Sequence, residues 1–184
     1  MGVRAMFRRR CLAMLGAALL LAAGPLWAAG DGEPPRAEAG RPAPDVTFTT
    51  LDGRTLRLSD FRGRPVMLWF ITTWCPSCTA SARELDRRIE ELDETDLAIV
   101  VLKLYENLGY EGPPLARFVE DNAPGLRDHP RVVWGEADFE TSRIYDPQAI
   151  TDLYWLIDRD GILWGSERAP AATFTTILDF AEMQ

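Results

Sequence analysis

The pattern of apolar and polar positions predicts strands that alternate with helices. Residues 46–58 (VTFTTLDGRTLRL) are two short alternating runs about an Asp-Gly turn, which is typical of a β-hairpin. Residues 65–71 (PVMLWFI) form a continuous apolar run of strand length, as in a strand buried on both faces. Residues 78–92 then place apolar side chains at steps of three and four. This spacing predicts an amphipathic helix that runs from the cysteine pair to about Leu92.

The rest of the chain continues the alternation and predicts the fold class. Buried or short strands are expected at 97–104 and 131–134, helices at 115–122 and 171–183, and a closing hairpin at 153–165. A strand-helix-strand crossover requires parallel central strands, whereas the closing hairpin adds antiparallel ones. We therefore predict an α/β fold with a central mixed sheet, helices on both faces and an N-terminal β-hairpin.

The first 28 residues have the order of a secretory signal. Four arginines precede an apolar run at 12–26, and small residues follow at 28–30. We expect cleavage near Ala28, with an uncleaved membrane anchor as the alternative and as the only membrane contact. Residues 29–44 are rich in Gly, Pro, Glu and Ala and predict a flexible tether, so the domain is expected at 45–184. The predicted location is extracytoplasmic, in the periplasm or at the outer face of the cytoplasmic membrane.

Charge and cysteine count narrow the functional classes. The net charge is −8 and becomes more negative without the arginine-rich start, which argues against nucleic acid and anionic lipid as partners. Of the three cysteines, Cys11 lies in the predicted signal, which leaves Cys75 and Cys78. In an oxidising compartment such a pair is expected to be a disulfide for at least part of the time.

The spacing WCPSC assigns different roles to the two sulfurs. The pair is predicted at the carboxyl end of a central strand and the start of a helix. The helix amino terminus stabilises an anion, so the pKa of Cys75 should be lowered and its thiolate should attack a partner disulfide. Cys78 is deeper by one turn and would resolve the mixed disulfide. Pro76 fits the first turn, where a missing N–H costs nothing.

Four other interpretations of the pair compete with a catalytic redox centre. A structural disulfide over a two-residue gap closes a very short loop and gains little entropy. Zinc needs about four ligands, and the exported part offers only His129 in addition to the pair. Copper(I) needs few soft ligands, so a copper-binding protein or metallochaperone is the main alternative, together with a non-catalytic redox sensor.

The segment APDVTFTTLDGRTLRLSDFRGRPVMLWFITTWCPSC, followed by YWLIDRDG, resembles the TlpA/ResA-like branch of the thioredoxin superfamily over residues 42–183. The resemblance implies a thioredoxin-like fold and extracytoplasmic thiol–disulfide exchange, often in cytochrome c maturation or copper-site assembly. It carries over Trp74, Cys75, Pro76, Ser77 and Cys78. It implies client proteins with disulfides or thiols as partners and a membrane electron donor. It implies no small-molecule cofactor and no resident metal, because the cysteines carry the electrons.

Two departures from this family point to the opposite side of the site. Thr151 and Asp152 stand where the superfamily has a cis-proline that shapes the docking groove, and the strand at 65–71 lacks the buried acid found in thioredoxins. We predict that Asp152 lies opposite the cysteines and handles their protons or tunes them. The alternative is that Asp152 only caps a loop.

Three weaker signals complete the list. Sco-type copper proteins share the missing proline but use CxxxC and a histidine near that strand, so their ligand set does not carry over. Thr72 stands three residues before Cys75 as in peroxiredoxins, but Leu68 occupies the position of their proline. The loop at 105–114 is longer than a minimal connection and would contact a partner if it lay beside the cysteines; otherwise it is an ordinary surface loop.

Overall fold

The computed structural model describes residues 35–184. The predicted signal at 1–28 lies outside the described residues. Within residues 35–184, no helix combines the length and the apolar character that crossing a membrane requires.

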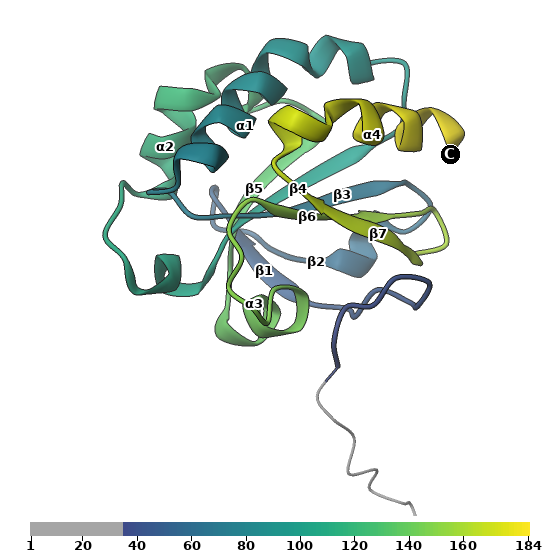
Figure 1. Cartoon of the computed structure of the whole chain (residues 1–184), viewed down its shortest axis with the longest axis horizontal. Coiled ribbons are helices and arrows are strands. Elements are labelled where there is room, and N and C mark those ends of the chain that lie inside the picture. Colours follow the sequence, from purple (N-terminus) through teal and green to yellow (C-terminus); the bar gives the residue numbers. More distant parts are fainter. Residues whose placement is uncertain (1–34) are drawn as a thin grey trace, which may run out of the picture. The chain divides into compact units, whose positions relative to one another are not determined.

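One seven-stranded sheet organises the described residues, in the order β2-β1-β5-β4-β3-β6-β7 (Figure 1). The neighbours β3, β4 and β5 are parallel, and the remaining pairs are antiparallel. The sheet thus has both the parallel centre and the two hairpins that the sequence predicts. Its strands are β1 (Thr47–Thr50), β2 (Thr55–Arg57), β3 (Val66–Ile71), β4 (Ala98–Lys103), β5 (Val132–Ala137), β6 (Leu153–Ile157) and β7 (Leu163–Arg168).

Helices cover both faces of the sheet, which confirms the predicted fold class (Figure 1). The longer helices α1, α2 and α4 pack on one face, and α3 packs on the other, where side chains of β1 also contribute to the core. The helices are α1 (Pro76–Arg88), α2 (Leu115–Asn122), α3 (Phe139–Tyr145) and α4 (Pro170–Met183), with 3₁₀ turns η1 (Leu58–Phe61), η2 (Ile89–Leu92), η3 (Tyr105–Gly109) and η4 (Pro124–Leu126).

Strand β3 is central, and its position explains its uninterrupted apolar sequence. Met67, Trp69 and Ile71 point toward α1, α2 and α4, whereas Leu68 and Phe70 contribute to the core on the α3 side. Every residue of β3 is buried, because strands on both sides and helices on both faces exclude water. This strand therefore provides a rigid base for the cysteine loop that follows it.

Helix α3 is the one helix of the described residues that the periodicity did not predict. It spans only seven residues, so it has fewer than two full turns of apolar pattern. The local signal is its cap, because the Asp138 side chain accepts a hydrogen bond from the Thr141 amide at 2.7 Å. Burial of Ile144 and Tyr145 against the sheet then stabilises a helix that would not form alone.

The segment before Asp45 is attached to the domain. Composition assigned residues 29–44 to a flexible tether, but the Ala37 amide donates to the Ile144 carbonyl at 3.0 Å. The Gly40 and Ala43 amides donate to carbonyls at the β6–β7 turn, and Ala43 is buried. The fold therefore includes residues 37–43. Backbone hydrogen bonds hold this segment, and its proline- and glycine-rich composition carries no periodic signal for them.

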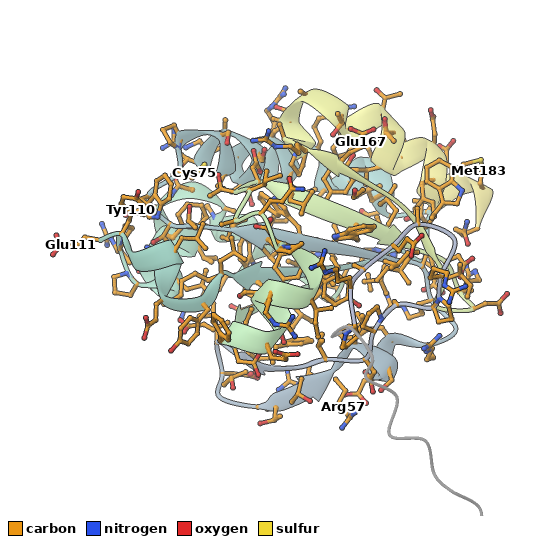
Figure 2. The ribbon with its side chains drawn as sticks, turned by 60° about the horizontal axis from the view of Figure 1, so that its bottom comes forward. Arg57, Cys75, Tyr110, Glu111, Glu167 and Met183 are labelled. Carbon is orange, nitrogen blue, oxygen red and sulfur yellow. The ribbon has the colours of Figure 1, made fainter. Side chains whose placement is uncertain are left out.

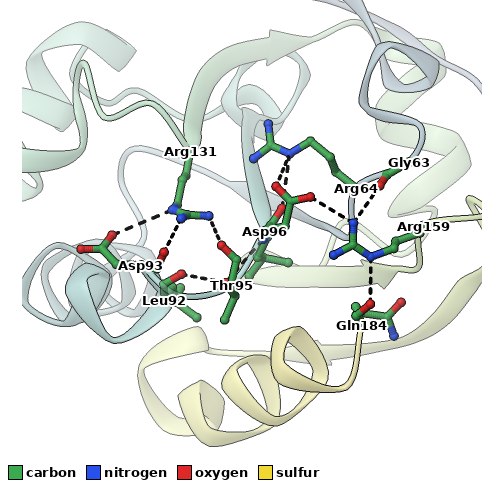
Figure 3. Close-up of polar contacts among 10 residues, drawn as sticks. Gly63, Arg64, Leu92, Asp93, Thr95, Asp96, Arg131, Arg159 and Gln184 are labelled. Atoms are coloured by element: carbon green, nitrogen blue, oxygen red, sulfur yellow. Dashed lines mark hydrogen bonds and ion pairs between the residues drawn. The ribbon is translucent and has the colours of Figure 1, made fainter.

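A polar cluster joins the loops at the end of the sheet opposite the cysteines (Figure 3). Asp96 pairs with Arg64 at 3.2 Å and with Arg159 at 3.0 Å. Arg159 also donates to the backbone carbonyl of Gln184 at 2.9 Å, and Arg131 donates to carbonyls of the loop before β4. These contacts are partly exposed, so each ion pair contributes at most about 1 kcal/mol. Their role is to hold the amino ends of β3, β4 and β5 to the end of α4.

Candidate active site

Cys75 lies where β3 gives way to α1, as the sequence predicts. It is the N-cap of α1, with extended φ and ψ of −80° and 122°. Its carbonyl accepts the first helical hydrogen bond from the Thr79 amide at 3.1 Å. Pro76 opens the helix, where an amide N–H would have no helical partner. The sulfur therefore stands at the positive end of α1 (Figure 2).

Two hydroxyl groups lie beside the Cys75 sulfur. Ser77 Oγ is 3.1 Å from Sγ, and Thr151 Oγ1, from the turn before β6, is also 3.1 Å from it. Burial opposes ionisation of Cys75, whose residue is 5% exposed. Hydrogen bonds from Ser77, Thr151 and the Cys78 amide together outweigh that burial and lower the pKa of Cys75 below its ordinary value.

Cys78 has the opposite acidity. Its side chain is fully buried, and burial raises its pKa far above the ordinary value; the negative charge of Asp152 raises it further. Both cysteines are reduced in this structure. The two thiols of one motif therefore differ strongly in acidity, with the thiolate favoured at Cys75.

Asp152 lies in the core beside the pair. It is 1% exposed; its Oδ1 accepts from Trp69 Nε1 at 3.0 Å, and its Oδ2 accepts from Ser81 Oγ at 3.1 Å. Burial raises its pKa, although hydrogen bonds from Ser77, Ser81 and Trp69 oppose that shift. The carboxylate thus bonds to β3 and α1 instead of its own loop, which argues against a loop-capping role.

The turn that carries Thr151 and Asp152 replaces the expected cis-proline with left-handed backbone. Asp152 has a φ of 64°, and residues 35–184 contain no cis peptide bond. The Asp152 amide donates to the Phe70 carbonyl at 3.1 Å, so the turn is fixed to β3 just before the cysteine loop. Aspartate tolerates this conformation better than most residues. Thr151 and Asp152 reach the cysteines from the opposite side of the site.

Asn107 is a site residue that the sequence analysis did not single out. It is 8% exposed; its Oδ1 accepts from the Thr73 amide and its Nδ2 donates to Thr73 Oγ1, each at 2.9 Å. Its carbonyl accepts from Trp74 Nε1 at 2.8 Å, and the Tyr110 ring lies 5.0 Å from the Trp74 ring. The loop at 105–114 therefore lies beside the active cysteine. Figure 2 shows Cys75 and Tyr110 at the same end of the domain.

The Asn107 turn has an unusual backbone. Glu106, Asn107 and Leu108 have φ values of 45°, 57° and 59°, all in the left-handed region. Three such residues in succession, none of them glycine, are costly unless other contacts impose them. A methyl group on Gly112 would lie 2.6 Å from Thr73 Oγ1, so the loop also packs tightly on the cysteine loop. Asparagine tolerates left-handed backbone, so Asn107 was the one feature of the sequence that could have predicted a turn of this kind.

The possible metal ligands do not gather around the pair. His129 precedes β5, at the end of the parallel strands opposite Cys75, and its Nδ1 lies near the Arg131 amide. Among residues 35–184 no group of three or more His, Cys, Asp or Glu side chains could hold a metal ion together. Among the described residues, a copper(I) ion at this site would find the thiolates of Cys75 and Cys78 but no histidine.

Comparison with known proteins places this geometry in a family. The family model described as AhpC/TSA family matches residues 39–125. Peroxiredoxin Bcp of Escherichia coli is 30% identical over 135 residues, which cover 67% of this chain and 81% of Bcp. The chain belongs to the AhpC/TSA family of thioredoxin-like proteins. The cysteine loop, β3 and α1 all lie within the residues that the family model matches.

Within the AhpC/TSA family, other relatives match shorter segments. The soluble secreted antigen MPT53 of Mycobacterium bovis is 42% identical over 53 residues, covering 29% of this chain and 31% of MPT53. The thiol-disulfide oxidoreductase ResA of Bacillus thuringiensis is 32% identical over 65 residues, 35% of this chain and 38% of ResA. These matches span only about a third of each relative. They confirm the predicted kinship with ResA-like proteins.

A solved structure supports the fold assignment for this AhpC/TSA-family chain. A secreted disulfide oxidoreductase of Mycobacterium tuberculosis aligns with a TM-score of 0.56 at 19% identity, over 76% of this chain and 96% of that one. At this identity the likeness concerns the fold, and the fold is the predicted thioredoxin-like one.

Proposed function

We propose that this protein is an extracytoplasmic thiol–disulfide oxidoreductase in which Cys75 and Cys78 exchange disulfides with client proteins. The observation that carries the proposal is the placement of the two thiols: Cys75 caps the start of α1 beside two hydroxyl groups, and Cys78 is fully buried one turn further on. This placement lowers the pKa of Cys75 and raises that of Cys78. A nucleophile that ionises easily and a buried thiol one turn away form a reaction pair. The relative ResA, a thiol-disulfide oxidoreductase, supports the activity, and the secreted relative MPT53 supports the location.

The reaction follows from this asymmetry. The Cys75 thiolate attacks one sulfur of a client disulfide, forms a mixed disulfide and releases a client thiolate. Cys78 then loses its proton and attacks Cys75 Sγ, which releases the second client thiolate and leaves the Cys75–Cys78 disulfide. Two electrons pass from the protein to the client. A membrane electron donor would return them, and no small-molecule cofactor is needed.

Asp152 would take the proton of Cys78 in the second step. The negative charge of Asp152 raises the pKa of Cys78, and burial raises the pKa of Asp152 itself. A carboxylate with a raised pKa is a stronger base than an ordinary one. Thioredoxins use a buried acid in the strand before the cysteines to relay this proton, and β3 has no acid. Asp152, directly before β6, would take over that role.

The test is turnover combined with a redox titration. The protein from residue 29 onward is equilibrated in thiol–disulfide buffers, and free Cys75 and Cys78 are counted by alkylation and mass spectrometry. We expect a reversible midpoint between about −270 and −120 mV and catalytic reduction of a model disulfide that Cys75→Ser abolishes. Cys78→Ser should accumulate the mixed disulfide. A midpoint below about −300 mV with unreactive thiols would overturn the proposal and direct attention to copper(I) binding by the reduced pair.

Thiol peroxidase activity is the second candidate, and Thr72 is the observation that favours it. Its Oγ1 is buried with no hydrogen-bond partner among the described residues, and it stands three residues before Cys75 as in peroxiredoxins. The relative Bcp is named a peroxiredoxin. Cys75 would attack a peroxide, becoming a sulfenic acid as the alcohol leaves, and Cys78 would form the disulfide and release water. Peroxide consumption that Thr72→Val removes, without loss of disulfide reduction, would establish this activity.

A further inference from the structure

A groove of about 420 Å³ lies between the η3 turn and α3 with the turn that follows it. Figure 1 shows these two segments on the same side of the domain. One polar contact links them, from the Tyr105 amide to Ser142 Oγ at 3.0 Å. The lining is mainly apolar, and it includes Tyr105, Leu108, Phe139, Asp146, Pro147 and Ala149.

Asp146 gives the groove an unused acceptor. The residue is 5% exposed, and its Oδ1 accepts from the Ile150 amide at 2.7 Å. Its Oδ2 is buried and has no hydrogen-bond partner among residues 35–184. Burial raises the pKa of Asp146 to about 6, so the group is mostly ionised at neutral pH. A buried, ionised oxygen without a donor is costly, and such groups in native proteins require an explanation.

The aromatic residues at the groove suit a flat cation. Tyr105 and Phe139 are 41% and 62% exposed, and their rings meet edge to face at 5.7 Å. Exposed aromatic rings attract arginine guanidinium groups, which are more weakly hydrated than ammonium groups. Glu106 adds negative charge to the lining. The lining cation, Arg143, is already engaged by both carboxylate oxygens of Glu140.

The groove is also connected to the reactive cysteine on both sides. The Asp146 carboxylate holds the Ile150 amide, directly before Thr151, whose hydroxyl contacts Cys75 Sγ. On the other wall, η3 holds the cysteine loop through Asn107. Both walls of the groove are therefore held to residues that contact Cys75 or its loop.

We propose that the groove binds an arginine side chain of the client polypeptide, with Asp146 as its counter-ion and the Tyr105 and Phe139 rings beside its guanidinium. This inference rests on the proposed function, because it defines which clients that function serves. Charge complementarity supports it: the lining offers Asp146, whose Oδ2 has no hydrogen-bond partner among residues 35–184, and the carboxylate of Glu106. The positive charge of Arg168 also acts on Asp146, but it makes no hydrogen bond to Oδ2, and the chain as a whole is acidic.

The first experiment measures binding without any redox step. Nα-acetyl-arginine amide and the neutral isostere Nα-acetyl-citrulline amide are titrated into the ¹⁵N-labelled reduced protein. We expect saturable shifts of the Phe139, Asp146 and Ile150 amides with arginine, and binding at least about fivefold weaker with citrulline. Asp146→Asn should remove the preference. Asp128→Asn, which deletes one exposed acid at the other end of β5, should keep it. Equal shifts with the two probes, or a preference that survives Asp146→Asn, would overturn the inference.

The second experiment separates this inference from the proposed function. Two peptide disulfides that differ only in arginine or citrulline near the cysteine are compared with bis(2-hydroxyethyl) disulfide, which is too small to reach the groove. Asparagine keeps an oxygen that can accept from the Ile150 amide. We therefore expect Asp146→Asn to raise KM for the arginine peptide and to remove the preference for it over the citrulline peptide, with any change in kcat/KM for the small disulfide shared equally by both peptides. Failure to reduce any disulfide would contradict the proposed function. Normal reduction without discrimination between the peptides would contradict the groove alone.

Discussion

Replacing Asn107 tests whether the hydrogen bonds of its side chain hold the cysteine loop in place. Asn107→Ala deletes two hydrogen bonds to Thr73 and leaves the buried Thr73 N–H without an acceptor. At about 1 kcal/mol for each bond and about 1 kcal/mol more for the stranded donor, the loss is about 3 kcal/mol. Alanine at the φ of 57° adds about 1–2 kcal/mol.

Asn107→Gly separates the hydrogen bonds from the backbone strain. Glycine loses the same bonds and adopts this backbone freely, but it costs about 0.5–1 kcal/mol through the more flexible unfolded chain. We therefore expect Asn107→Gly to be less destabilised than Asn107→Ala by about 0.5–1 kcal/mol. Thr73→Val, which keeps the amide bond to Oδ1, should cost about 1–2 kcal/mol.

The assay is equilibrium urea unfolding of the reduced proteins, followed by tryptophan fluorescence and by far-UV circular dichroism. Trp74 also reports locally, because its indole N–H donates to the Asn107 carbonyl. If Asn107→Ala lies within about 1 kcal/mol of the unaltered protein, or is more stable than Asn107→Gly, the clamp is energetically minor and the reasoning from its bonds and backbone is wrong.

Three further predictions concern protons at and near the site. Asp152→Asn should slow the attack of Cys78 on the mixed disulfide by about 100-fold while changing the first attack by Cys75 less, as measured by stopped-flow and quenched-flow alkylation; equal resolution rates would exclude the proton-acceptor role. Thr151→Val should raise the pKa of Cys75 in the pH profile of iodoacetamide alkylation, because it removes a hydrogen bond to the thiolate, whereas Thr151→Ser should not. An unshifted profile for the valine variant would contradict this role of the hydroxyl. The raised pKa of Asp146 means that folded protein loses stability as pH rises from about 4 to about 6, because the unfolded carboxyl ionises first. Asp146→Asn should therefore gain about 2 kcal/mol over the unaltered protein between pH 4 and pH 7 in urea unfolding, and a pH-independent difference would contradict the assigned pKa.

Much of the fold could be predicted because its elements repeat a simple pattern. Residues 65–71 had the continuous apolar sequence of a central strand, and β3 pairs with β4 and β6 through that stretch. The exceptions lack periodicity: α3 is too short to show a repeat, and residues 37–43 attach through backbone hydrogen bonds. Neither kind of contact depends on a regular spacing of apolar side chains.

The candidate site divides in the same way. The cysteines could be placed because an apolar strand precedes them and Pro76 follows Cys75. Thr151 and Asp152 could be placed because they stand where the thioredoxin superfamily has a cis-proline. Asn107 could not, because its role depends on a left-handed turn and on a loop meeting Thr73 from 34 residues away. The groove beside Asp146 was likewise beyond sequence reasoning, since its walls come from two separate loops.

The residues that bury the cysteine pair from the side of β6, Thr151 and Asp152, come late in the sequence. Thr151 is 76 residues beyond Cys75, and Asp152 is 83 residues beyond its partner Trp69. A chain that emerges from its amino end therefore exposes the cysteine loop well before the residues that shelter it, and such distant contacts form slowly. During that interval Cys78 is as open to oxidants as Cys75. A disulfide between the two would span only two intervening residues, so it would need no other part of the fold and would keep both sulfurs from over-oxidation while the chain folds.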